Sequence, residues 1–346
     1  MSETSVRKFD LNIEKILEGW EVCHAIREVI ANALDEQALT GGKDIGIKKD
    51  AARNWHIRDY GRGLKYEHLT QNENEEKLRN SANVVGKFGV GLKDALATLH
   101  RRGARVKICS KYCNICLDVA RKHDFSDVST LHAAISPPTN ASLVGTDVMF
   151  EGISDADIVA AKSYFLRFSG ERVLETTRHG QILRRDANGK ARIYVKGLLV
   201  AEEENFTFSY NITSLTSAMN KALNRERTNV GRTAYADRVK AMLLACNSSA
   251  VAGALADDLM GLEKGTSHDE VNWIDVAVHA CQILSASKKV VFVSATQRTM
   301  FPDTIGHAIA DGYNVVTVPE NIRERLPDTK DIQGKPVRDL QVYQRE

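Results

Sequence analysis

Three short motifs in the first hundred residues hold the side chains best suited to chemistry. The first is Glu28-x-x-x-Asn32-x-x-Asp35. Residues three and four apart share one face of a helix, so two carboxylates and an amide would project into one small volume. Such oxygen groups suit a hydrated Mg²⁺ ion, with Asn32 as a ligand and Glu28 as the base that activates or orients a water. The spacing also fits an amphipathic helix with a solvated polar face.

The second motif, Asp59-x-Gly61-x-Gly63, follows the strand-like residues 54–58. Glycines let the backbone turn sharply and approach a flat ligand closely. The Asp59 carboxylate can then accept a hydrogen bond from an exocyclic amine. Asp and Gly are also the commonest residues of ordinary turns, which is the alternative reading of this motif.

The third motif is a glycine-rich loop that precedes a stretch with helical periodicity, which ends near His100. Glycines at a helix N-terminus expose backbone N–H groups and the positive end of the helix dipole, an arrangement that cradles phosphate. The polar residues 71–83 before it indicate a mobile lid. The residues expected at the phosphates are Gly86, Lys87, Phe88, Gly89, Val90, Gly91 and Lys93.

The elements that must position these motifs are also readable. Apolar residues recur at helical spacing over residues 20–39, which predicts a helix that carries the first motif. Residues 104–110 and 114–121 predict two adjacent strands of one sheet.

In this order and at this spacing, the motifs resemble those of the GHKL ATPase superfamily, which includes gyrase B, the large heat-shock chaperones, sensor histidine kinases, MutL and the MORC proteins. The runs from Arg27 to Asp35 and from Gly86 to Gly91 are close to the versions in the heat-shock chaperones. The resemblance covers residues 11–152 and weakens beyond. It implies an α+β chain whose residues 1–153 form an ATP-binding α/β sandwich of the Bergerat type.

The resemblance also implies roles for individual residues. Glu28 would be the general base and Asn32 the Mg²⁺ ligand. Asp59 would bind the adenine amine, supported through a water by Thr146, which follows a glycine ahead of a predicted strand. Further nucleotide contacts would come from Asp35, Gly61, Gly63 and the residues of the third motif.

Residues 154–249 resemble the transducer domain, related to ribosomal S5 domain 2, that follows the ATPase domain in MutL, gyrase B and the heat-shock chaperones. An Asn-Gly pair between alternating runs predicts a β-hairpin over residues 182–195. The resemblance implies that a basic residue of this domain stabilises the charge that develops on the transferred phosphoryl group. The candidates are Lys196, Arg225 and Arg227, whose surroundings also fit a basic surface loop.

Residues 250–346 predict a strand, a helix and a second strand, which together suggest a small parallel α/β unit with a polar tail. We find no catalytic constellation in this part of the sequence. Cys109-x-x-x-Cys113-x-x-Cys116 has a spacing seen in iron–sulfur and zinc ligation. Because no second cysteine pair stands at a usual zinc spacing, the predicted role of these cysteines is apolar filling of strands.

Composition narrows the class of protein. A chain of 346 residues has room for two or three domains, and its net charge of +2 does not argue for nucleic acid. Residues 181–240 hold eleven Lys or Arg against six Asp or Glu, a patch that fits either phosphate backbones or a solvated surface. The sequence shows neither a signal peptide nor an apolar run near the ~20 residues of a membrane span, so we expect a cytoplasmic protein.

Two functions of different class follow. The first is an ATPase that acts as a conformational switch, in which ATP closes the lid and, by the family pattern, brings two protomers together as a homodimer that acts on DNA or on a protein client. The second is a nucleotide-sensing interaction module with little or no turnover. Glu28 favours the ATPase, because a sensor needs no base.

Overall fold

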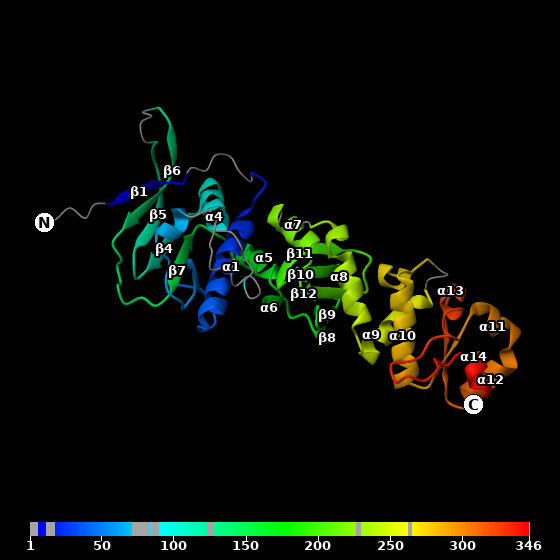
Figure 1. The fold of residues 1–346 in the computed structure, drawn as a ribbon. Helices are drawn as coiled ribbons and strands as arrows, with labels where there is room; N and C mark the ends of the chain where they lie inside the picture. Colours follow the sequence, from blue (N-terminus) through cyan, green and yellow to red (C-terminus); the bar gives the residue numbers. More distant parts are fainter. Residues whose placement is uncertain are drawn as a thin grey trace. The chain divides into compact units, whose positions relative to one another are not determined.

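The computed structural model describes residues 6–11, 18–70, 84, 90–122, 127–225, 230–261 and 265–345. The chain is mixed α+β, as predicted, and forms two compact units, Met1–Ser169 and Gly170–Glu346 (Figure 1). The boundaries predicted from the sequence lie instead after residues 153 and 249, and that division stays a prediction. Helix α5 (Asp155–Ser163), which follows the first of these boundaries, packs against the first helix of the first unit.

The first unit is built on a seven-stranded sheet in the order β1-β6-β5-β4-β7-β3-β2, with every neighbouring pair antiparallel. The predicted adjacency of two strands is confirmed, because β4 pairs with β5 and Ile108 lies opposite Ile115. The strands are β1 (Arg7–Asp10), β2 (Gly46–Lys49), β3 (Trp55–Arg58), β4 (Arg105–Ser110), β5 (Asn114–Arg121), β6 (Ser129–Ser136) and β7 (Thr146–Glu151).

Helices cover this sheet and bury its apolar residues. Helix α1 (Val22–Thr40) packs on α4 (Val90–Arg101), on α5 and on strand β3. Its apolar stripe includes Ile26 and Ile30, which have no exposed surface, so burial of this stripe fixes which way the polar residues of α1 point. Two short helices complete the unit, α2 (Glu67–Thr70) and α6 (Leu166–Ser169).

The second unit begins with a five-stranded sheet in the order β11-β10-β12-β9-β8. The predicted hairpin over residues 182–195 is wrong: its two strands form, but β12 lies between them and pairs parallel with β10. All five residues of β12 are buried, so central placement of this strand outweighs local pairing across the Asn-Gly turn. The strands are β8 (Val173–Thr177), β9 (Gly180–Arg184), β10 (Ala191–Val195), β11 (Leu198–Glu203) and β12 (Phe208–Ile212).

One apolar core runs from this sheet through the helices to the C-terminal strands. The predicted parallel unit is confirmed, because β13 (Val290–Val293) pairs parallel with β14 (Asn314–Thr317). Within the described ranges no single helix is long and apolar enough to cross a membrane, although α8 and α9 together, bent by 115°, meet that test by length and composition. The helices are α7 (Ser217–Arg225), α8 (Arg232–Leu244), α9 (Ser249–Leu259), η2 (Asp269–Asn272), α10 (Ile274–Ser287), α11 (Ala295–Met300), α12 (Pro302–Ala310), α13 (Glu320–Arg323) and α14 (Leu340–Arg345).

Candidate functional site

Asp59 and Thr146 meet at one end of the first sheet because β3 and β7 pair there. Arg58 lies opposite Asp147, and the ladder continues one residue further, where the Asp59 N–H donates to the Thr146 carbonyl at 3.0 Å. The Asp59 Oδ1 accepts from the N–H of Gly61 at 2.9 Å and from that of Thr146 at 3.2 Å. Three residues that the sequence singled out are therefore in direct contact.

The Asp59 carboxyl is buried, with 6% of the residue exposed. Burial raises its pKa, the N–H groups of Gly61 and Thr146 oppose that shift, and nearby Glu36 adds to it. Among the described residues no cation contacts this carboxylate. A buried carboxylate without a cation is costly, and such groups concentrate at functional sites.

Two glycines leave the space that this arrangement needs. Gly63 and Gly145 have φ of 90° and 80°, a backbone region that favours glycine. A Cβ on Gly145 would lie 2.1 Å from the Asp59 carbonyl oxygen, and one on Gly63 would lie 3.2 Å from the Gly145 carbonyl oxygen. The Thr146 Oγ1 also accepts from the Leu64 N–H at 3.0 Å, so the glycine-spaced loop is anchored to β7 on both sides of Gly63.

An ion pair that the sequence analysis missed ties this loop to α1. The Glu36 carboxylate accepts from the Arg62 backbone N–H at 2.8 Å and from the Arg62 Nε and Nη2, both at 2.9 Å. A Cβ on Gly61 would lie 2.3 Å from the Glu36 Cγ, so glycine leaves room for this contact. The sequence does contain a signal for this ion pair, because the two opposite charges stand next to the predicted motifs. Glu36 directly follows Asp35 of the first motif, and Arg62 lies between the glycines of the second.

On α1, the carboxylates of the first motif point into the protein. Glu28 is 2% exposed and Asp35 is 1% exposed, while Asn32 between them is half-buried. The alternative of a solvated polar face is therefore wrong for the two carboxylates. The structure places all three on one helix, as the spacing predicts.

Arg27, to which the sequence analysis gave no role, holds the Glu28 carboxylate. Its Nη2 and Nε donate to the Glu28 Oε1 at 2.8 and 3.2 Å, and both side chains are buried. The guanidinium also contacts the rings of Trp20 and Tyr164, at 5.3 and 5.2 Å from their centroids. A planar, stacked guanidinium fixes the carboxylate more rigidly than a lysine could.

The third motif is described only in part. Gly91 is buried and Lys93 is partly exposed, and both lie in the first turns of α4. Val90 begins that helix, but its side chain is outside the description. Gly86, Lys87, Phe88 and Gly89 lie outside the described residues.

The three basic candidates belong to the second unit. Lys196 and Gly197 form the two-residue turn between β10 and β11, and Lys196 adopts φ of 50°, where non-glycine residues are uncommon. Arg225 is the last residue of α7, with a side chain outside the description, and Arg227 lies outside the described residues.

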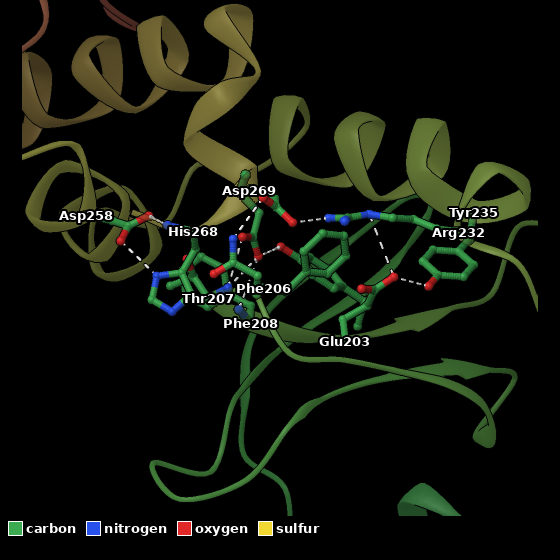
Figure 2. A network of polar contacts seen from close by, with 12 residues as sticks. Glu203, Phe206, Thr207, Phe208, Arg232, Tyr235, Asp258, His268 and Asp269 are labelled. Carbon is green, nitrogen blue, oxygen red and sulfur yellow. Dashed lines mark hydrogen bonds and ion pairs between the residues drawn. The ribbon is translucent and has the colours of Figure 1, made fainter. Parts of the chain in front are cut away.

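The second unit also contains a polar network that was not predicted from the sequence (Figure 2). The fully buried Glu270 carboxylate accepts from the N–H of Thr207 at 2.8 Å, the N–H of Phe208 at 3.2 Å and the hydroxyl of Tyr210 at 2.8 Å. Burial raises the pKa of Glu270, and these donors oppose the shift. Glu270 thus fixes η2 to the start of β12.

Arg232 extends the network to β11 and α8 (Figure 2). It pairs with Asp269 at 2.5 Å and with Glu203 at 3.7 Å, and its guanidinium lies 4.5 Å from the Phe206 ring centroid. Glu203 also accepts from the Tyr235 hydroxyl. Since the carboxylates shown here are engaged by donors of the protein, we assign the network a structural role.

Replacement of Glu270 by glutamine is expected to destabilise the protein. The new amide would turn donor hydrogens toward groups that are themselves donors, which costs about 1–3 kcal/mol. Urea unfolding should show this loss, and the exposed Glu202→Gln change on β11 should stay within about 0.5 kcal/mol of the wild type. A Glu270→Gln variant as stable as Glu202→Gln would contradict the assigned role.

Asp59 should leave a signature in the pH dependence of stability. A carboxyl whose folded pKa is raised contributes stability that is complete below its ordinary pKa, about 4, and lost as pH rises through the folded pKa. The Asp59→Asn variant lacks this loss, so its stability relative to wild type should grow from pH 4 toward neutrality in urea unfolding. The control is Asp118→Asn, because the hydrogen bond from Lys8 lowers the pKa of Asp118 and predicts the opposite trend. A difference between Asp59→Asn and wild type that does not grow with pH would contradict the burial of an ionised Asp59.

Comparison with known proteins gives a family without a stated activity. Residues 156–249 match the family model described as the Mycoplasma pneumoniae MPN635 N-terminal domain. An uncharacterized protein of Mycoplasma pneumoniae is 37% identical over 242 residues, 69% of this chain and 97% of that relative. A second uncharacterized protein of the same organism is 23% identical over 167 residues, 48% of this chain and 47% of the relative. The ATPase region of Saccharomyces cerevisiae topoisomerase II aligns over 52% of this chain and 62% of its own, with a TM-score of 0.31 and 10% identity, a level that does not define a fold. The chain belongs to the same family as the 37% identical Mycoplasma pneumoniae protein.

Proposed function

We propose that the first unit binds Mg-ATP and hydrolyses it, with Asp59 reading the exocyclic amine of adenine. The observation that carries this proposal is the Asp59 carboxylate, which is buried, raised in pKa and in contact with no cation of the described residues. An ionised carboxylate has about four acceptor positions, and two backbone N–H groups together with the Thr146 hydroxyl do not fill them. An amine donor on a flat ligand supplies the missing hydrogen bond.

The α1 residues support the hydrolytic part of the proposal. Glu28 is the proposed base, and Arg27 holds its carboxylate in place through two donors. Asn32 lies one turn further along and is the proposed Mg²⁺ ligand, because magnesium takes few protein ligands and keeps its waters and substrate phosphates. Asp35, a second turn along, completes the polar side of the proposed site.

Phosphate binding is assigned to the glycine-rich segment ahead of α4. Gly91 and Lys93 lie in the first turns of that helix, where backbone N–H groups and the helix dipole favour an anion. Phosphate contacts stay a prediction from the sequence for Gly86, Lys87, Phe88, Gly89 and Val90.

Beyond the nucleotide, the proposal follows the resemblance alone. It includes ATP-driven closure, a nucleotide-dependent homodimer, and action on DNA or a protein client. The second candidate, a sensor that binds ATP with little or no turnover, shares the Asp59 contact and differs in what Glu28 does. Binding and turnover must therefore be measured separately.

Nucleotide binding and steady-state hydrolysis, measured on the same samples, test the proposal. Asp59→Asn should weaken ATP binding by about 1.5–3 kcal/mol, the range for a hydrogen bond to a charged group. Glu28→Gln keeps an acceptor for Arg27, so it should bind ATP and lose about 10²–10⁴-fold in turnover, as expected for loss of a general base. Glu67→Gln, at an exposed residue, and Asp118→Asn, at a partly exposed one, are the matched controls.

The outcomes separate the two candidates. Turnover that depends on Glu28 favours the ATPase. Binding that depends on Asp59, without turnover in the wild type, favours the sensor. Failure of the wild type to bind ATP would contradict both.

Lys196 gives a further test of the proposal that a basic residue of the second unit assists turnover. Its backbone conformation costs an ordinary residue about 1–2 kcal/mol, and asparagine tolerates it better, so Lys196→Asn should be no less stable than wild type. If Lys196 stabilises the developing charge, this variant should bind ATP normally and lose tenfold or more in turnover. Lys190→Asn, at an exposed lysine before β10, is the control. Unchanged turnover in Lys196→Asn would exclude Lys196.

A further inference from the structure

A short turn at one end of the second sheet gathers positive groups. Arg178 and His179 are the two residues between β8 and β9, where Thr177 pairs with Gly180. The His179 carbonyl accepts from the N–H groups of Thr213 at 3.0 Å and Ser214 at 3.2 Å, so the segment after β12 fixes the turn. These two hydrogen bonds therefore fix the backbone from which the imidazole projects.

Two guanidinium groups contact the two nitrogens of this one imidazole. The Arg178 Nε lies 3.1 Å from the His179 Nε2, and the Arg238 Nη1, which comes from α8, lies 2.8 Å from the His179 Nδ1. Guanidinium groups only donate, and a neutral imidazole has one acceptor nitrogen. One of the two contacts must therefore set an N–H against an N–H.

No negative charge compensates this arrangement within the described part of the chain. Arg178 and Arg238 take part in none of the ion pairs found there, and the residues packed on the turn from the β12 side, Thr213 and Ser214, are uncharged. The Arg238 Nε is buried and has no hydrogen-bond partner. Burial, Arg238 and Arg178 all lower the pKa of His179.

We propose that Arg178, His179 and Arg238 form a binding site for a phosphate group. A tetrahedral dianion offers acceptors to both guanidinium groups and to an imidazole N–H at once, and guanidinium binds phosphate through charge-assisted, two-pronged hydrogen bonds. Such a ligand removes the N–H against N–H conflict and supplies the missing negative charge. This site lies in the second unit and does not rest on the proposed ATP site.

The phosphate can belong to a free phosphate or phosphomonoester, or to the phosphodiester backbone of a nucleic acid. Arg178 is exposed, and His179 and Arg238 are half-buried, so a phosphate that projects from a larger molecule can also reach them. Both sources present anionic phosphate oxygens to the same guanidinium groups, with one negative charge on a phosphodiester and up to two on a free phosphate or phosphomonoester, and the experiment below distinguishes them.

The test follows the imidazole signals of the full-length chain labelled with ¹⁵N-histidine. The chain has ten histidines, and the signal missing in His179→Gln identifies His179. Inorganic phosphate, compared with chloride at equal ionic strength, should shift this signal saturably and move its titration to higher pH. Because the signal comes from His179 itself, it reports phosphate binding at this site independently of nucleotide binding elsewhere in the chain.

Arg238→Gln should weaken phosphate binding by about tenfold or more, as expected for loss of a charge-assisted hydrogen bond. Lys240→Gln makes the same change of charge on α8, at a residue paired with Asp275, and should bind phosphate like the wild type. Arg178→Gln, in an exposed turn, is a second variant expected to weaken binding. The signals of the other histidines report whether each variant is folded.

Duplex DNA that competes with phosphate for the same signal identifies the phosphodiester source, and DNA without effect identifies the free phosphate or phosphomonoester. Phosphate that acts no differently from chloride, or variants at Arg178 and Arg238 that both bind like the wild type, would overturn the proposal.

Discussion

The antiparallel register of β3 and β7 is the constraint on which the candidate site depends. It places Asp59 and Thr146 side by side just past the last strand pair, Arg58 and Asp147. Because side chains alternate faces along a strand, a slip of one residue would turn Asp59 away from the Thr146 N–H that donates to it. Gly145 permits the close approach, since any side chain there would collide with the Asp59 backbone. The local geometry of the loop follows from this pairing.

Three of the carboxylates buried among the described residues, Glu28, Asp59 and Glu270, show how the protein offsets such burial. Glu28 has the Arg27 guanidinium, and Glu270 has two backbone N–H groups and a tyrosine hydroxyl. Asp59 has two backbone N–H groups, the Thr146 hydroxyl and no cation of the described residues, and its pKa is raised. Burial of charge is costly unless donors or an opposite charge offset it, so a further donor from a ligand would stabilise the Asp59 carboxylate.

What the sequence could predict was local, and what it missed depends on tertiary contacts. Helical spacing identified α1 and the shared helix of its three polar motif residues, and apolar runs identified the parallel pair β13 and β14. The hairpin over residues 182–195 failed because β12, which comes later in the chain, occupies the space between β9 and β10. The partners Arg27 of Glu28 and Arg62 of Glu36 were overlooked, since a charge on a helix or in a turn reads as surface until packing is known. The conflict at His179 likewise appears only when α8 brings Arg238 to the turn.

The most direct test of the central claim compares the affinity of the wild-type protein for Mg-ATP and Mg-ITP by equilibrium dialysis. The two nucleotides differ at the purine 6-position, where ATP has an amine donor and ITP has a carbonyl acceptor. If Asp59 reads that amine, ITP leaves a buried carboxylate facing another acceptor, and ATP should bind at least about 100-fold more tightly, given the cost of an unsatisfied buried charged group. Equal affinity for the two nucleotides, or no binding of ATP, would contradict the account.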